Sequence, residues 1–354
     1  MSSRVGYVDI VKGIAIIAVV MGHISVQLPE CDCLPSYRSL IYMWHVPLFF
    51  LVSGLFVDDR KVQRGFFSFC WRKVKQLYLF ALFFYIPALL LHNWFIELGW
   101  YRTDVPIGNK IISEWSLMDM GLSIGKVLLC MGREPILGAM WFVYVLLFAF
   151  IGYAIITWVC GRMKIPDLWK FVVLCVLAFV SSILTRVYGV MIPRVSNVFP
   201  AMLLIDVGRI LFRYGVKRVR LDDWRVAIVS LVVLLILCTI FSGCFMNTND
   251  FPDILVLVIS AVSAFYLFSF IGSKIEHTIV GRVLSYFGRN SFWIMALHFV
   301  GFKICSLILI CLFHQPVPLY MLNPDVGNSF SLWLMYLIFG IFISLLPKLV
   351  FGKR

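Results

Sequence analysis

The sequence contains little charge. Only 14% of its 354 residues are Asp, Glu, Lys or Arg, whereas 62% are hydrophobic and the mean hydropathy is +0.95. A water-soluble domain with so few charges could not cover its surface with polar groups. Repeats, low-complexity tracts and long polar segments are also missing, which argues against a separate soluble domain. We therefore expect an all-α polytopic integral membrane protein that forms one domain over residues 1–354.

Acidic residues are scarcer than basic ones, at 18 against 31, and the net charge is +13. In a soluble chain this excess would favour a nucleic-acid partner, but here its distribution follows the apolar windows. About ten windows are long enough to cross a bilayer: 8–27, 38–57, 76–95, 140–160, 168–187, 197–212, 226–244, 253–271, 290–312 and 330–350. With the amino terminus inside, most basic residues fall on the cytoplasmic side. The positive-inside rule thus predicts that both termini are cytoplasmic and that no nucleic acid is bound.

Several motifs are missing as well. The sequence has no apparent signal peptide, no nucleophile elbow, no Walker loop and no dinucleotide fingerprint, which argues against soluble hydrolase, NTPase and dehydrogenase chemistry. Cysteines and carboxylates do not stand at metal-ligand spacing near the histidines, so we expect no metal. Cys31 and Cys33 are too close in sequence for a good metal pair or an unstrained disulfide.

One connection is long. Residues 96–139 form a predicted external segment that contains Trp100, Trp115 and several acidic residues. Tryptophan with carboxylates suits a sugar, but it suits an interfacial aromatic belt equally well. The aromatic content favours an ordered segment in either case.

Ionisable residues inside apolar windows are costly in lipid, and each is a functional hypothesis. Lys12 and His23 enclose "KGIAIIAVVMGH"; eleven residues apart, they share one helix face. Asp9 stands one turn before Lys12, so that an ion pair with Asp9 is an alternative explanation for the lysine. His45 enters the second window from the outer side, and Pro47 should kink the helix there.

Two further groups complete the candidates. In the ninth window, "FGRNSFWIMALH", Ser291 and His298 share a face, and Asn290 suits a helix cap or a hydrogen bond into a pore. In the first cytoplasmic loop, Arg72, Lys73 and Lys75 stand at the mouth of the third window. Basic side chains there suit the phosphates of a cytosolic ligand, although orientation in the membrane explains part of the excess.

These stretches occur in a familiar order. "YVDIVKGIAIIAVVMGHIS", "IYMWHVPLFFLVSGLF", "FCWRKVKQLYLF", "MWFVYVLLFAF" and "YFGRNSFWIMALHF" together resemble the membrane-bound acyltransferase-3 family, most closely its fucose 4-O-acetylase-like branch, which modifies bacterial surface sugars. The resemblance covers nearly the whole chain. It implies a ten-span fold in the bacterial inner membrane, a cytosolic acyl-CoA donor, here acetyl-CoA, and a saccharide or glycolipid acceptor.

The resemblance also implies site residues. It implies that His23, His45 and Lys12 are catalytic, and Lys12 stands where the family more often has arginine. The phosphates of the donor are expected to bind to basic side chains: Arg72, Lys73, Lys75 and Lys12. Substrate or oxyanion contacts fall on Asp9, Trp141, Asn290, Ser291 and His298. A homo-oligomer is compatible with this pattern. The alternative function is a proton-coupled secondary transporter of a glycan or small metabolite, because buried histidines also carry protons in transporters.

Overall fold

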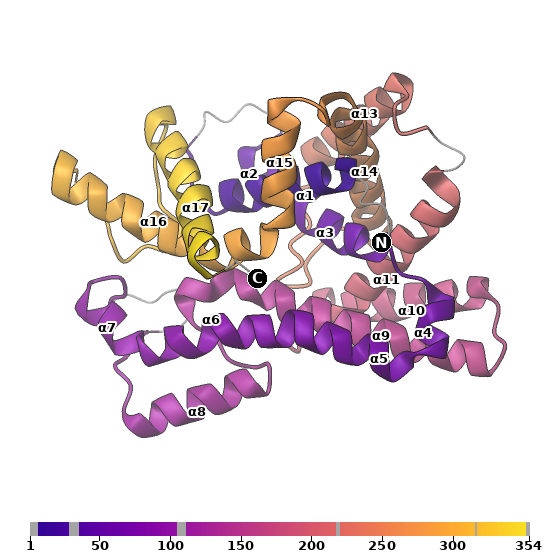
Figure 1. The fold of residues 1–354 in the computed structure, drawn as a ribbon, viewed down its shortest axis with the longest axis horizontal. Coiled ribbons are helices and arrows are strands. Elements are labelled where there is room, and N and C mark those ends of the chain that lie inside the picture. Colours follow the sequence, from indigo (N-terminus) through magenta and orange to yellow (C-terminus); the bar gives the residue numbers. More distant parts are fainter. Residues whose placement is uncertain (1–5, 28–34, 105–110, 217–219, 316, 352–354) are drawn as a thin grey trace. The chain divides into compact units, whose positions relative to one another are not determined.

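The computed structural model describes residues 6–27, 35–104, 111–216, 220–315 and 317–351 (Figure 1). Within these ranges the regular secondary structure is helical, and β-pairing is limited to the isolated bridges Ser25–Asp325 and Phe245–Asp250. The all-α prediction is confirmed for this part of the chain. Cys31 and Cys33 lie outside the described residues.

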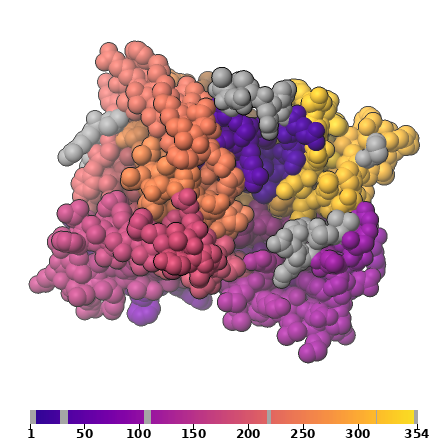
Figure 2. All heavy atoms as spheres, turned by 180° about the vertical axis from the view of Figure 1, so that it is seen from behind, coloured from indigo at the N-terminus to yellow at the C-terminus, as the bar shows by residue number. Residues whose placement is uncertain are grey.

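The chain divides into two compact units that alternate along the sequence. Unit 1 comprises Met1–Val19, Pro29–Tyr78 and Trp141–Ser291, and unit 2 comprises Val20–Leu28, Leu79–Met140 and Phe292–Arg354. Figure 2 therefore draws unit 2 in separate colours, purple for its middle segment and yellow for its carboxyl-terminal segment. That the chain forms one domain stays a prediction.

Helix α1 (Gly6–Gly22) begins in unit 1 and ends in unit 2. The other helices of unit 1 are α2 (Tyr37–Tyr42), α3 (His45–Gly54), α4 (Asp59–Arg64), α5 (Phe66–Lys73), η1 (Val74–Tyr78), α9 (Trp141–Arg162), α10 (Asp167–Arg186), α11 (Val198–Ile210), η3 (Leu211–Gly215), α13 (Trp224–Ile240), α14 (Ile254–Ile275) and α15 (Ile279–Arg289). Unit 2 contains α6 (Leu79–Leu90), α7 (His92–Glu97), α8 (Leu117–Leu128), η2 (Pro135–Met140), α16 (Ser291–Phe313, of which Ser291 is counted with unit 1) and α17 (Phe330–Phe351).

Every predicted apolar window contains a helix, because long apolar runs without turn residues satisfy their backbone hydrogen bonds internally. Six helices in the described ranges are long and apolar enough to cross a membrane: Phe66–Leu90, Pro135–Arg162, Asp167–Arg186, Ile254–Ile275, Ser291–Phe313 and Phe330–Val350. The multi-pass membrane character is thus supported. The count of about ten spans and the cytoplasmic position of both termini stay predictions.

The first window is shorter than predicted. Helix α1 ends at Gly22 rather than near residue 27, since the following residues pair with a loop 300 positions away. Ser25 donates its backbone N–H to Pro324 and accepts one from Val326, at 2.9 and 3.0 Å, and Gln27 donates to Gly327 at 2.8 Å. His23 thus stands directly after the helix, with its own N–H bonded to the Val20 carbonyl at 3.2 Å.

The second window is interrupted, but not by Pro47. The break falls at Met43 and Trp44, where Trp44 has φ −132° and ψ −25°, and α3 starts at His45. Pro47 occupies the first turn of α3, where its missing N–H removes no helical hydrogen bond. His45 bridges the break, because its Nδ1 lies 2.7 Å from the Ile41 carbonyl oxygen of α2.

Glycines let helices of unit 1 touch backbone to backbone. A Cβ at Gly54 of α3 would lie 1.9 Å from the Ile205 carbonyl oxygen of α11, and one at Gly208 of α11 would lie 2.0 Å from that of Leu51. Small residues allow this close approach where helices pack within a membrane. The backbones of α3 and α11 therefore pack directly against each other within unit 1.

The long segment 96–139 contains helix α8. Helix α8 starts with a capping box, in which Ser116 accepts from the Asp119 N–H and Asp119 accepts from the Ser116 N–H. In Figure 1 it lies beside α6 of the same unit. Its residues Leu117 and Met118 are 89% and 74% exposed, so an apolar face is left uncovered, as in a helix that lies in the membrane interface.

Candidate active site

Two of the predicted site residues meet in unit 2. The His23 and His298 ring centroids lie 5.1 Å apart with the rings inclined at 31°, and Phe299 contacts both rings, at 4.8 and 4.2 Å. His298 is fully buried, whereas His23 is half-buried. The pairing of residues 25–27 with 324–327 brings Asn323 to His23, whose Nδ1 lies 3.3 Å from the Asn323 Oδ1.

The hydrogen bonds of His298 fix its tautomer. Its Nδ1 lies 3.1 and 3.0 Å from the backbone carbonyl oxygens of Ile294 and Met295. Carbonyl oxygens only accept, so Nδ1 carries the proton and a neutral ring exposes a lone pair at Nε2. That Nε2 is buried and has no hydrogen-bond partner among the described residues. Because such a group is costly unless something binds it, His298 offers an acceptor for a hydroxyl.

Three predicted donor ligands gather in unit 1. The Lys73 ammonium, near the end of α5, is close enough to Lys12 of α1 and to Arg72 to be repelled by both. Its Nζ lies 3.5 Å from the centre of the Phe150 ring on α9, a cation–π contact. The Lys75 Nζ lies 5.3 Å from the centre of the Trp71 ring. The gathered positive charge suits an anion such as a phosphate.

The remaining predicted residues take separate positions. His45 packs edge-on against Tyr42, with ring centroids 5.0 Å apart, and it belongs to unit 1, whereas His23 belongs to unit 2. Asn290 lies between the last residue of α15 and Ser291, the first residue of α16, and its Nδ2 donates to the Tyr286 carbonyl at 2.8 Å. Buried Ser291 begins α16, and Trp141 begins α9. The pairing of Asp9 with Lys12 stays a prediction.

Sequence reasoning missed a second buried histidine of unit 2. His92 has its Nδ1 at 3.1 Å from Glu134 Oε2 and its Nε2 at 3.1 Å from the Ser113 carbonyl oxygen. The Ser113 carbonyl oxygen only accepts, so Nε2 carries a proton, and opposite a Glu134 carboxylate Nδ1 would carry a second one and form an ion pair. Trp115 stacks on this ring at 3.6 Å, with the planes 7° apart.

Tyr101 completes this cluster. Its hydroxyl donates to Glu134 Oε1 at 2.6 Å and accepts the Ile136 N–H at 3.1 Å. Burial, and then the neighbouring Glu134 carboxylate, raise the pKa of Tyr101 above its usual range, so that it stays a donor. Glu134 stands among the acidic residues of segment 96–139, but no local pattern pairs it with a histidine 42 positions earlier.

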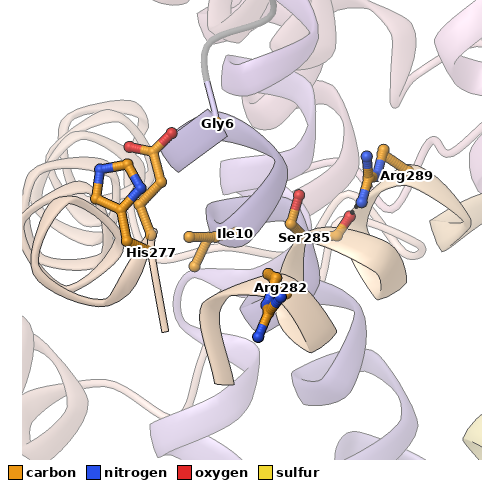
Figure 3. A pocket seen from close by; sticks show the side chains of 7 residues that line it. Gly6, Ile10, His277, Arg282, Ser285 and Arg289 are labelled. Atoms are coloured by element: carbon orange, nitrogen blue, oxygen red, sulfur yellow. Dashed lines mark hydrogen bonds between the residues drawn. The ribbon is translucent and has the colours of Figure 1, made fainter. Parts of the chain in front are cut away.

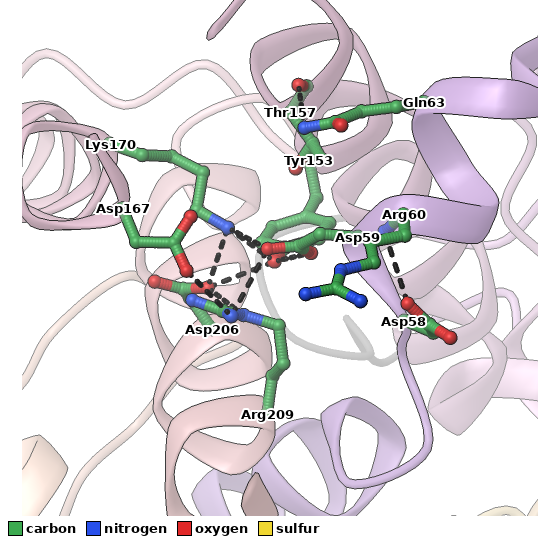
Figure 4. A network of polar contacts seen from close by, with 10 residues as sticks. All are labelled: Asp58, Asp59, Arg60, Gln63, Tyr153, Thr157, Asp167, Lys170, Asp206 and Arg209. Atoms are coloured by element: carbon green, nitrogen blue, oxygen red, sulfur yellow. Dashed lines mark hydrogen bonds and ion pairs between the residues drawn. The ribbon is translucent and has the colours of Figure 1, made fainter. Parts of the chain in front are cut away.

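Sequence reasoning also missed an ion network in unit 1. Figure 4 shows Lys170 of α10 and Arg209 of α11 both reaching towards Asp59 of α4 and Asp206 of α11. Lys170 Nζ lies 2.6 Å from Asp59 Oδ2, and Arg209 Nε lies 2.7 Å from Asp206 Oδ1. The Tyr153 hydroxyl lies within 2.9 Å of both carboxylates, and Asp167 contacts Arg209 from the exposed side.

This network joins four helices of unit 1, α4, α9, α10 and α11, and its charges nearly balance. A buried ion pair costs desolvation that good geometry must offset, so it fixes one arrangement more than it stabilises the fold. Asp206 was the available signal: it is an acidic residue inside the apolar window 197–212.

No three His, Cys, Asp or Glu side chains come together as a metal site requires within the described ranges. That the protein binds no metal stays a prediction.

The comparison with curated proteins found no match, nor did the comparison with solved structures. The family model described as an acyltransferase domain, that of the acyltransferase-3 family, matches residues 5–352, which is nearly the whole chain. It spans both units and every site residue named above. The chain therefore belongs to the acyltransferase-3 family, which indicates an acyltransferase.

Proposed function

We propose that the protein is a membrane O-acyltransferase that moves an acetyl group from acetyl-CoA to a hydroxyl of a saccharide. The acceptor in this proposal is a cell-surface or capsular polysaccharide precursor at a bacterial inner membrane, as in the fucose 4-O-acetylase-like branch. Membership of the family supports acyl transfer. The single observation that carries the assignment of chemistry is the His23–His298 pair, in which the His298 Nε2 has no partner in the described part of the chain and lies beside a half-buried imidazole.

The donor end of the proposal rests on the cations of unit 1. Lys12 and Arg72 lie close enough to Lys73 to repel its ammonium, and Lys75 adds a further positive charge on the same helical segment as Arg72 and Lys73. Acetyl-CoA carries phosphates at one end and the thioester at the other. Charge-assisted hydrogen bonds from these side chains would hold the phosphates while the thioester enters the protein.

The acceptor end rests on unit 2. His23 takes the proton of the attacking hydroxyl, since an imidazole with a pKa near 6.5 in solution is suited to general base catalysis. The His298 Nε2 accepts a hydrogen bond from a neighbouring hydroxyl of the sugar and so orients the ring. The hydroxyl oxygen then attacks the thioester carbonyl carbon, the C–S bond breaks, and the thiolate recovers the proton from His23. Asn290, Ser291 and His45 are the proposed oxyanion contacts, with Asp9 and Trp141 as further substrate contacts.

The test uses a deletion strain complemented with native protein or with His23→Ala or Lys12→Ala, and it measures the mass of the surface glycans. We expect the native protein to restore one acetyl group per modified site and His23→Ala to fall by about 10²- to 10⁴-fold. His314→Asn is the matched control, because His314 is an exposed histidine with φ 49°, a conformation that asparagine tolerates.

Transfer of label from acetyl-CoA by purified protein in liposomes confirms the donor. Full activity of both His23→Ala and Lys12→Ala would contradict the proposal. A flux that depends on a pH gradient and needs no acyl-CoA would instead identify the transporter.

A further inference from the structure

A pocket of about 330 Å³ opens in unit 1, and none of the residues that line it is assigned to the acyl-transfer reaction. Its lining comes from the start of α1, the turn after α14 and one face of α15: Gly6, Ile10, Glu276, His277, Arg282, Ser285 and Arg289. Figure 3 shows His277 on one side of Ile10 and the three α15 side chains on the other. On α1, Lys12 points about 160° away from Ile10, so this pocket is distinct from the Lys12 cation cluster.

The polar lining favours an anion. Arg282 and Arg289 outnumber the single carboxylate of Glu276, which leaves the lining with a net positive charge even when His277 is neutral. Arg289 Nε donates to the Ser285 carbonyl at 3.2 Å, which orients its guanidinium and leaves the Nη donors for a ligand. The positive end of the α1 dipole, at Gly6, also faces this pocket.

Close helix contacts hold the pocket in shape. A Cβ at Gly288 of α15 would lie 1.8 Å from the Asp9 carbonyl oxygen, and one at Gly13 of α1 would lie 2.0 Å from that of Leu284. The backbones of α1 and α15 are therefore in direct contact on both sides of the crossing. The arginine face of α15 is fixed beside the first turns of α1 by this packing.

Helix α15 has an exposed apolar face next to its arginine face. Ile279, Val280 and Val283 are 72%, 60% and 43% exposed, and Tyr286 is 37% exposed. At 100° per residue, Arg282, Ser285 and Arg289 fall within about 60° of one another, and Tyr286 follows about 40° further round. A basic face that adjoins an uncovered apolar face is typical of helices that lie in the membrane interface, with the apolar residues among acyl chains and the arginines at headgroup level.

We propose that this pocket binds the phosphate of an acidic phospholipid headgroup, while the lipid's acyl chains cover Ile279, Val280 and Val283. The pocket supplies two guanidiniums and the Ser285 hydroxyl to the phosphate oxygens. A free nucleotide phosphate would leave the apolar face of α15 exposed, whereas the acyl chains of a lipid would cover it. The apolar face therefore favours a lipid over a soluble ligand.

The experiment measures lipid binding to the full-length protein by native mass spectrometry, with phosphatidylglycerol against phosphatidylcholine as probes. Each arginine near an acidic lipid contributes about 1 kcal/mol, or about fivefold in affinity, so Arg282→Gln/Arg289→Gln should reduce the phosphatidylglycerol preference by about thirtyfold. Arg213→Gln/Arg225→Gln removes the same charge from exposed positions outside the pocket and should leave the preference unchanged. Arg282→Lys/Arg289→Lys keeps the charge and should retain most of it.

An equal preference in the native and Gln-substituted proteins would overturn the inference. If the Gln-substituted protein does not fold, Ser285→Glu replaces it, because this half-exposed position brings a carboxylate into the pocket; an unchanged preference there would also overturn the inference. Adenosine 3′,5′-bisphosphate is the second probe. If it binds the native protein but not the Gln-substituted protein, while phosphatidylglycerol shows no preference, the ligand is a nucleotide phosphate and the lipid assignment is wrong.

Discussion

His92 and His298 are both buried histidines of unit 2, but their rings are bound differently. His92 has an acceptor at each nitrogen, Glu134 on one side and Ser113 on the other. His298 has carbonyl oxygens at Nδ1 and no partner among the described residues at Nε2. Burial alone therefore does not identify a reactive histidine. A ring whose hydrogen-bonding capacity is fully used stabilises the fold, whereas a ring with an unused acceptor can bind a substrate.

The largest expected effect is on stability, at His92. His92→Phe leaves the Glu134 carboxylate buried without its cation, which should lower the free energy of unfolding by about 3–5 kcal/mol. Activity per folded molecule should remain close to native. Thermal and denaturant unfolding in detergent measure the first quantity, and acetyl transfer normalised to folded protein measures the second. His92→Phe/Glu134→Leu removes both charges and should recover much of the loss; no recovery would show that the ion pair is not the cause.

The next effect is on catalysis, at His298. His298→Phe keeps an aromatic ring beside Phe299 and Phe302 and removes only the nitrogens, so we expect unfolding to change by less than about 1.5 kcal/mol. In contrast, kcat/KM for the saccharide should fall by about 10- to 100-fold, because the oriented hydroxyl loses its acceptor. Steady-state kinetics at varied acceptor concentration provide the measurement. If His298→Phe lowered the stability but left kcat/KM at the native value, His298 would have the structural role that we assign to His92, and the prediction would be wrong.

The smallest effect is expected at Asp104, an exposed carboxylate paired with Arg102. The hydrogen bond from Arg102 lowers the pKa of Asp104 below its usual value, yet both groups stand in water, where ion pairs contribute little. Asp104→Asn should leave both Tm and activity at native values. A clear loss of Tm would contradict this prediction, because it would show that an exposed ion pair in this segment stabilises the fold.

The sequence predicted the helices well and the contacts between them poorly. Apolar runs identify where helices form, since the hydrophobic pattern is local. The end of α1 at Gly22 depends on pairing with residues 324–327, so it is not visible in a local window. His23 and His298 were predicted one by one, and the structure adds that they face each other. Asp59, Asp206 and Lys170 were missed as a group because their spacing of up to 147 positions has no sequence signature.

The most direct test of the account is the protonation of the two rings, observed by solid-state nitrogen NMR of ¹⁵N-histidine-labelled protein in liposomes. His92→Phe and His298→Phe assign the signals. We predict two protonated ring nitrogens at His92, and at His298 one protonated nitrogen, Nδ1, with a bare Nε2. A protonated Nε2 at His298, or a neutral His92, would contradict the claim that one ring is fully bound and the other is left open for substrate.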